Sequence, residues 1–162
     1  MNFDGKIIFI RHGENMIDDS ISNNLLPLSE LGKKQAYEAF QTLKGQFDVV
    51  ISSPSKRAMM TAHIISPNSK ILYDKRLLER GWGNEKQDGL ESDYEAKERI
   101  KSFMAEYMES YPNKNILFVT HGGLMILIQE VIEGKKMERG SINNCDIIEY
   151  SFNHKKIMKN KI

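Results

Sequence analysis

Cysteine and long apolar runs are nearly absent from this sequence of 162 residues. Its single cysteine, Cys145, excludes an intramolecular disulfide and a zinc site built from several cysteines, and is typical of a reducing compartment. The longest apolar run, Leu124 to Ile128, is far too short to span a bilayer. The amino-terminal residues have the pattern of neither a signal peptide nor an anchor, since Asp4 interrupts a very short apolar run. We therefore expect a cytoplasmic protein that has no membrane partner.

A strong excess of charge of one sign is also missing. The chain has 23 Lys and Arg against 22 Asp and Glu, which gives a formal net charge of +1. No global field would recruit nucleic acid or an anionic membrane, so any anion site has to be a local cluster. Internal repeats, low-complexity tracts and Pro- or Ser-rich linkers are absent, and we predict a single domain over residues 1–162.

One short stretch near the amino terminus combines an apolar run with polar, cationic residues. The run from Ile7 to Ile10 is typical of a strand buried on both faces, and it ends in Arg11, His12 and Gly13. In open α/β sheets, ligands bind at the carboxyl ends of the strands. This position favours a chemical role for His12 and an anion-holding role for Arg11.

Strand and helix patterns alternate along the rest of the chain. Further strands are predicted at residues 47–51, 70–73, 115–120 and 145–152. Helices are predicted at about 29–44, at 54–65 with Pro54 in the first turn, at about 90–111 and at 124–132. Residues 15–24 and 77–89 are expected to be loops, and the Lys-rich tail from Lys155 either forms an edge strand or frays. The alternation predicts an α/β fold: a three-layer α/β/α sandwich with a mostly parallel central sheet.

If these strands are parallel, four cationic or imidazole side chains meet at one edge of the sheet. Arg57 lies in the helix after the second strand, His121 follows the fourth strand, and Arg11 and His12 follow the first. Arginine matches phosphate oxygens with a planar fork, and a phosphomonoester is largely dianionic at neutral pH. A neutral imidazole can attack phosphorus and divide phosphoryl transfer into two steps. The pattern therefore favours phosphate-ester chemistry.

The leaving alkoxide of such a reaction needs a proton. Five acidic residues in and just after the 77–89 loop are candidates for this general acid: Glu79, Glu85, Asp88, Glu91 and Asp93. Glu79 follows its strand most closely and is the best of them.

Five ordered sequence blocks resemble the phosphoglycerate mutase-like branch of the histidine phosphatase superfamily. They are Arg11-His12-Gly13-Glu14; Pro27-Leu28-Ser29-Glu30-Leu31-Gly32 with Gln35-Ala36; Ser52-Ser53-Pro54-Ser55-Lys56-Arg57-Ala58 with Thr61-Ala62; Leu78-Glu79 with Gly83; and Val119-Thr120-His121-Gly122-Gly123. A tripeptide such as Arg-His-Gly recurs by chance, whereas five blocks in the family order make a specific match over the whole chain.

This resemblance implies a role for each catalytic position. His12 becomes phosphohistidine, and Arg11, Arg57 and His121 bind the phosphoryl oxygens. Glu79 protonates the leaving group and then deprotonates the attacking water. No metal and no cofactor are implied.

Three further positions concern the phosphate pocket. The resemblance implies that the backbone N–H of Gly122 contacts phosphate. Many family members have Asn six residues after the nucleophile, where this chain has Asp18. Since a carboxylate would repel a phosphate dianion, we expect Asp18 to point away or its loop to shift. Asn15 is expected to supply an amide in its place.

The predicted function is a metal-independent phosphomonoester phosphatase acting on a small phosphorylated metabolite. The alternatives are a phosphoglycerate mutase, a protein phosphohistidine phosphatase and an inactive module that only binds a phospho-ligand. Mutases of the family carry a longer insertion between the positions of Glu79 and His121, where this chain has little besides one helix. The sequence sets no oligomeric state.

Five other residues receive less specific interpretations. Glu14 is expected to orient its neighbours rather than act as an acid, and Cys145 to be a small buried apolar residue. His63 and His154 are expected to be structural or at the surface. Trp82 either lines the substrate mouth or packs beneath its loop.

Overall fold

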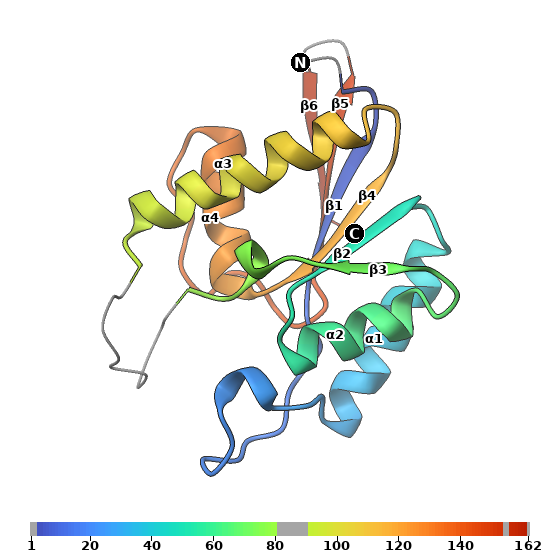
Figure 1. The fold of residues 1–162 in the computed structure, drawn as a ribbon, viewed down its shortest axis with the longest axis vertical. Helices are drawn as coiled ribbons and strands as arrows, with labels where there is room; N and C mark the ends of the chain where they lie inside the picture. The colour runs from blue at the N-terminus through green and yellow to red at the C-terminus, as the bar shows by residue number, and fades with distance from the viewer. Residues whose placement is uncertain (1–2, 81–90, 154–155, 162) are drawn as a thin grey trace.

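The computed structural model describes residues 3–80, 91–153 and 156–161. Its elements are β1 (Lys6–Arg11), η1 (Asn23–Leu25), α1 (Glu30–Leu43), β2 (Val49–Ser52), α2 (Lys56–Ile65), β3 (Ile71–Tyr73), η2 (Lys75–Leu77), α3 (Asp93–Ser110), β4 (Ile116–Thr120), α4 (Gly122–Glu133), β5 (Ile147–Asn153) and β6 (Lys156–Lys161). Figure 1 shows the predicted alternation of strands and helices.

The six strands form one mixed sheet in the order β3-β2-β4-β1-β5-β6. β1 pairs parallel with β4, and β2 pairs parallel with both β4 and β3. In this register Arg11 lies opposite Thr120, so β1 and β4 end side by side, as expected from the sequence. β5 runs antiparallel to β1, and β6 antiparallel to β5.

Helices cover both faces of the sheet and confirm the predicted three-layer α/β/α architecture (Figure 1). α3 and α4 pack with one face of β1 and β4, and α1 and α2 pack with the other. α4 is buried along most of its length, consistent with its apolar sequence. Within the described ranges, no helix is both long and apolar enough to cross a membrane.

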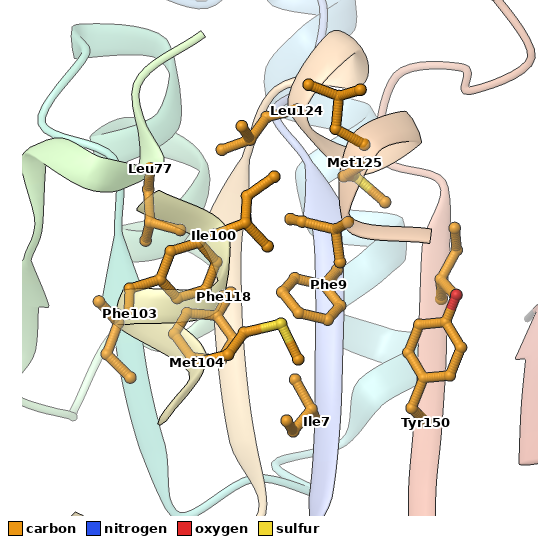
Figure 2. Packing of buried hydrophobic residues seen from close by; sticks show 14 of the residues in the cluster. Ile7, Phe9, Leu77, Ile100, Phe103, Met104, Phe118, Leu124, Met125 and Tyr150 are labelled. Atoms are coloured by element: carbon orange, nitrogen blue, oxygen red, sulfur yellow. The ribbon is translucent and has the colours of Figure 1, made fainter. Parts of the chain in front are cut away.

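The larger core cluster is built around aromatic rings from β1 and β4. The ring of Phe118 stacks on Phe9 with centroids 5.2 Å apart and lies 5.3 Å from the ring of Phe103 on α3 (Figure 2). Phe118 is fully buried. Because β4 leads directly into His121, this packing holds the strand that carries a candidate site residue.

Phe118→Ala is expected to lower the free energy of unfolding by about 3–5 kcal/mol, because it removes a fully buried ring and leaves a cavity. Urea denaturation monitored by circular dichroism measures this change. Tyr94→Ala, at a side chain that is 73% exposed on α3, is the matched control and should change stability by no more than about 0.5 kcal/mol. Equal losses in the two variants would contradict this account of the core.

Two helices begin later than the sequence predicted. Pro54 was expected in the first turn of α2, but that turn begins after Ser55, which is the N-cap residue. The long helix α3 begins after Ser92 rather than at Leu90. Its start is a capping box, in which Ser92 and Glu95 satisfy each other's backbone N–H groups.

The carboxyl-terminal strands also differ in detail. β5 begins at Ile147 rather than Cys145, because Cys145 has a left-handed backbone with φ of 56° that no regular strand accommodates. Of the two alternatives for the Lys-rich tail, the edge strand is correct, since β6 pairs with β5. The expectations for Trp82, Glu85, Asp88 and His154 fall outside the described residues.

Candidate active site

His12 lies directly beyond β1 and is 4% exposed. Its Nδ1 lies 2.7 Å from the carbonyl oxygen of Gly13, and its Nε2 lies 3.0 Å from Nε of Arg57. A carbonyl only accepts hydrogen bonds and a guanidinium only donates them. Nδ1 therefore carries the proton, and Nε2 presents a lone pair toward Arg57.

The turn that carries His12 is fixed by contacts on both sides. The Gly13 N–H donates to Oγ1 of Thr61 at 3.1 Å, and this hydroxyl donates to the carbonyl of Arg57 at 2.8 Å. On the other side, the Asn144 amide donates to the His12 carbonyl at 3.1 Å. A Cβ on Gly13 would lie 2.4 Å from the carbonyl oxygen of Gly32, so only glycine lets α1 approach so closely.

Arg57 connects the two histidines. It stands in the first turn of α2 and is 3% exposed. Besides the bond from Nε to His12, its Nη2 donates to Nδ1 of His121 at 3.3 Å, and its Nη1 donates to the Asn23 carbonyl at 2.5 Å. Burial lowers the pKa of Arg57, and the charge of Glu79 opposes that shift. The guanidinium remains cationic at neutral pH.

His121 directly follows β4, is the N-cap residue of α4 and is fully buried. Its Nδ1 accepts from Arg57, so its Nε2 carries the proton and donates to Oγ of Ser53 at 2.9 Å, with Oγ of Ser55 at 3.3 Å. Its ring centroid lies 5.0 Å from that of His12. Sequence reasoning assigned no role to these two serines, although hydroxyls after a buried strand were a usable signal.

Both imidazoles are neutral at neutral pH. Burial lowers the pKa of His12 to about 3, and the positive charges of Arg57 and Arg11 add to the decrease. Burial also lowers the pKa of His121 well below its usual value, with further contributions from His12 and the arginines. A neutral His12 has the free lone pair that a nucleophile requires.

The depressed pKa of His12 makes the fold sensitive to acid. The folded pKa of about 3 lies below the unfolded value of 6.5, so the unfolded chain alone takes up this proton as the pH falls between them. The contribution of neutral His12 to the free energy of unfolding is therefore complete above pH 6.5 and is lost as the pH falls toward 3. His12 alone should account for a loss of about 2 kcal/mol between about pH 6.5 and about pH 5.

Urea denaturation in phosphate-free buffers at several pH values measures this loss, and His12→Gln should reduce the slope. The same slope in wild type and His12→Gln would contradict a buried, neutral His12.

Arg11 has one buried donor without a hydrogen-bond partner in the described part of the chain. Its Nη1 donates to the Ile142 carbonyl at 2.6 Å, while its Nε is buried and has no hydrogen-bond partner among the described residues. A Cβ built on Gly122, the first residue of α4, would lie 3.2 Å from this Nε. An unpaired guanidinium N–H beside a helix amino terminus is suited to an anionic oxygen.

Glu79 contacts the same end of α4. Its Oε2 accepts from the Gly123 N–H at 3.1 Å, and its Oε1 accepts from the N–H groups of Leu124 and Arg80, each at 3.0 Å. Burial raises the pKa of Glu79, while these three hydrogen bonds and the charge of Arg57 oppose the increase. A raised pKa lets a carboxyl group keep its proton to a higher pH than an exposed one, which suits a general acid.

Two residues of the 15–24 loop are directed elsewhere. The Asn15 amide donates to the carbonyl of Met16 at 2.8 Å and does not join the histidines and arginines. Asp18 lies in an exposed part of the loop and accepts from the N–H and the hydroxyl of Ser20. The structure thus holds the Asp18 carboxylate on its own loop, one of the two outcomes expected from its charge.

Three other residues lie around the site. Glu14 accepts from the Ser29 hydroxyl at 2.7 Å, so it ties the loop after His12 to α1. Cys145 is partly buried, and its backbone N–H donates to the Arg11 carbonyl at 3.1 Å, a contact that no sequence pattern indicated. His63 is exposed and contacts the Tyr73 hydroxyl, away from the site.

The structure therefore brings His12, Arg57 and His121 into direct contact, and Arg11 and Glu79 both lie beside the first turn of α4. Two guanidinium groups and two imidazoles can surround one tetrahedral anion, and Glu79 can exchange a proton beside it. Within residues 3–80, 91–153 and 156–161, no group of three or more His, Cys, Asp or Glu residues is arranged to hold a metal ion.

Similarities to known proteins agree with this geometry. A family profile described as histidine phosphatase superfamily (branch 1) matches residues 7–88 and 82–161. The chain is 27% identical over 163 residues to the uncharacterized phosphatase PhoE of Bacillus subtilis (strain 168), a match that covers 86% of this chain and 84% of that protein.

Two solved structures share the fold. A mutant phosphoserine phosphatase from Entamoeba histolytica, in complex with phosphoserine, superposes with a TM-score of 0.79 at 21% identity, covering 97% of this chain and 95% of that one. A phosphoglycerate mutase from Bacillus anthracis str. Sterne gives a TM-score of 0.81 at 20% identity, covering 98% and 92%. The family profile spans most of the chain and its motifs form one site, so the protein belongs to the histidine phosphatase superfamily, branch 1.

Proposed function

We propose that this protein is a metal-independent phosphomonoester phosphatase that acts on a small phosphorylated metabolite through a phosphohistidine at His12. The observation that carries the proposal is the position of Arg57, whose guanidinium reaches Nε2 of His12 and Nδ1 of His121 at once. A phosphoryl group held by this guanidinium lies next to the His12 lone pair, which is the geometry that nucleophilic attack requires.

The first step transfers the phosphoryl group to His12. The phosphate dianion accepts N–H bonds from Arg57 and from the unpaired Nε of Arg11, so Arg57 releases the His12 lone pair. Nε2 of His12 attacks phosphorus, the bond to the ester oxygen breaks, and Glu79 donates its proton to that oxygen. The Nδ1–H bond to the Gly13 carbonyl stabilises the ring as it becomes cationic.

The second step returns the enzyme to its starting state. The ionised Glu79 takes a proton from water, the water oxygen attacks phosphorus, and the P–N bond breaks. The bonding electrons return to Nε2 of His12, inorganic phosphate leaves, and Glu79 is protonated again for the next cycle.

Hydrolysis is favoured over mutase chemistry because a mutase has to protect its phosphohistidine from water. The sequence between Glu79 and His121 is short, and its described part consists mainly of α3 and β4, which leaves few residues that could form a water-excluding cover. The similarity to a Bacillus protein named as a phosphatase, and to an Entamoeba phosphoserine phosphatase, supports a phosphatase of small phosphate esters.

The direct test measures inorganic phosphate released from an aryl phosphate by the full chain in the presence of EDTA. We expect turnover that added divalent metal does not raise and that vanadate inhibits in a parallel assay without EDTA, because EDTA would bind the vanadate. Loss of turnover on chelation would contradict the metal-independent reaction. Efficient phosphoglycerate isomerisation with negligible hydrolysis would instead establish a mutase, and phosphate binding without any turnover would establish a binding module.

Glu79→Gln is expected to lower kcat/KM for an alkyl phosphate by about 10²–10⁴-fold and to affect an aryl phosphate far less, since only the alkoxide needs a proton. Steady-state assays on the two esters measure the ratio. Glu98→Gln, at an exposed position of α3, is the control and should leave both values unchanged. Equal losses on the two esters would contradict the role of Glu79 as the acid.

A further inference from the structure

Two successive glycines begin α4, and each faces a different functional side chain. A Cβ built on Gly122 would lie 3.2 Å from Nε of Arg11. A Cβ built on Gly123 would lie 2.7 Å from Oε1 and 3.2 Å from Cδ of Glu79, and real Cβ atoms essentially never approach another heavy atom as closely as 2.7 Å. The first turn of α4 thus lies close to both Arg11 and the proposed acid Glu79.

Backbone conformation does not explain the glycine at position 123. Gly123 lies within α4 and has no positive φ, so any residue can adopt its conformation. Glycine is also less favourable than alanine within a helix. What the site requires is therefore the absence of a side chain.

The close approach is part of how the carboxylate is held. Oε2 of Glu79 accepts from the Gly123 N–H and Oε1 from the Leu124 N–H, so the carboxylate lies directly against the backbone of the first turn. A side chain on Gly123 would occupy the space through which the carboxylate reaches these two donors. Without them, only the Arg80 N–H remains among the three backbone donors described for this group.

We propose that Gly123 is a positioning residue for Glu79, and that its missing side chain sets where the catalytic proton is held. The proposal rests on the proposed function, because it assigns Glu79 the task of protonating the leaving group. The carboxylate is the far end of a flexible side chain, so it can move away from an added methyl group at little cost to the fold. Gly123→Ala should therefore give a folded protein whose acid is displaced.

The expected signature depends on the leaving group. Gly123→Ala should lower kcat/KM for an alkyl phosphate by about 10- to 100-fold, because a displaced acid transfers its proton poorly. Activity on an aryl phosphate should change by less than about threefold, since its leaving group departs without a proton. A purely structural defect would lower both values together.

Gly122→Ala is the matched control, because it makes the same chemical change one residue away in the same turn. Its methyl group would crowd Arg11 rather than Glu79, so it should lower activity on both esters by a similar factor. The contrast between neighbouring alanines separates crowding of the acid from any general effect on the start of α4.

A double-mutant cycle with Glu79→Gln tests whether Gly123 acts through Glu79. In the Glu79→Gln background, Gly123→Ala should cause no more than about a threefold further loss of kcat/KM on the alkyl ester, because the glutamine that it displaces has no acidic proton to donate. Additive losses would overturn the proposal. So would equal losses on the two esters in Gly123→Ala alone.

The melting temperature of each variant is measured by thermal unfolding. Melting of Gly123→Ala close to wild type supports a carboxylate that moves aside. Failure of Gly123→Ala to fold would overturn the proposal, even if the Glu79→Ala/Gly123→Ala double variant folds, because the Glu79 carboxylate would then be unable to move aside at little cost. If the wild-type chain hydrolyses neither ester, both the positioning role of Gly123 and the proposed function are wrong. If the wild-type chain turns over normally but Gly123→Ala lowers both activities equally, or its loss adds to that of Glu79→Gln, only the positioning role of Gly123 is wrong.

Discussion

His12→Ala is expected to reduce turnover of every phosphate ester by about four orders of magnitude or more, because it removes the proposed nucleophile. The remaining guanidinium groups would still bind phosphate. We therefore expect KM and the affinity for inorganic phosphate to change much less than kcat. Steady-state assays with an aryl phosphate, together with equilibrium binding of inorganic phosphate, measure the two effects separately.

His63→Ala is the appropriate control, since His63 is an exposed histidine that contacts only the Tyr73 hydroxyl among the interactions described. Its turnover should equal that of wild type. His12→Gln preserves much of the side-chain volume and shows whether the loss in His12→Ala comes from a cavity. Turnover within tenfold of wild type in either His12 variant would rule out His12 as the nucleophile.

Arg57→Ala should produce the second largest effect, a decrease in kcat/KM of about three orders of magnitude, because it removes donors that stabilise the transferring phosphoryl group. The same change removes the partner of both His12 Nε2 and His121 Nδ1. Arg57→Lys should recover little of the loss, since an ammonium is a point charge and cannot replace a planar fork.

Lys56→Ala provides the matched control for Arg57. Lys56 precedes Arg57 in the same turn of α2 and is exposed, so its loss changes the local charge without touching the site. Steady-state kinetics on one ester compare the three variants. A decrease in Arg57→Ala of less than tenfold, or an equal decrease in Lys56→Ala, would contradict the bridging role.

Much of this fold could be predicted because its central strands are buried on both faces. A short apolar run such as Ile7 to Ile10 is typical of a strand that is buried on both faces, and the polar residues that follow it then lie at the edge of the sheet. The reversal of β5 could not be predicted, because an apolar run carries no information on strand direction. The left-handed backbone of Cys145 could not be predicted either, because it depends on tertiary contacts.

Most residues of the candidate site could be predicted, whereas the two serines beside His121, the outward position of Asn15 and the contacts within the site could not. The order of the strands brings His12, Arg57 and His121 to one edge, as the sequence indicated. The tautomer of each histidine depends on partners such as Ser53, which is distant from His121 in sequence. Likewise, the need for glycine at position 123 depends on how Glu79 packs against α4, which no local pattern encodes.

The most direct test of the central claim is to locate the phosphoryl group during turnover. A radiolabelled aryl phosphate is mixed rapidly with the full chain, the reaction is quenched in alkali to preserve phosphohistidine, and the labelled peptide is sequenced. We predict an acid-labile, alkali-stable label on His12 that forms and decays at rates consistent with kcat. A label on any other residue, or full hydrolysis with no label under conditions that preserve it, would contradict the account.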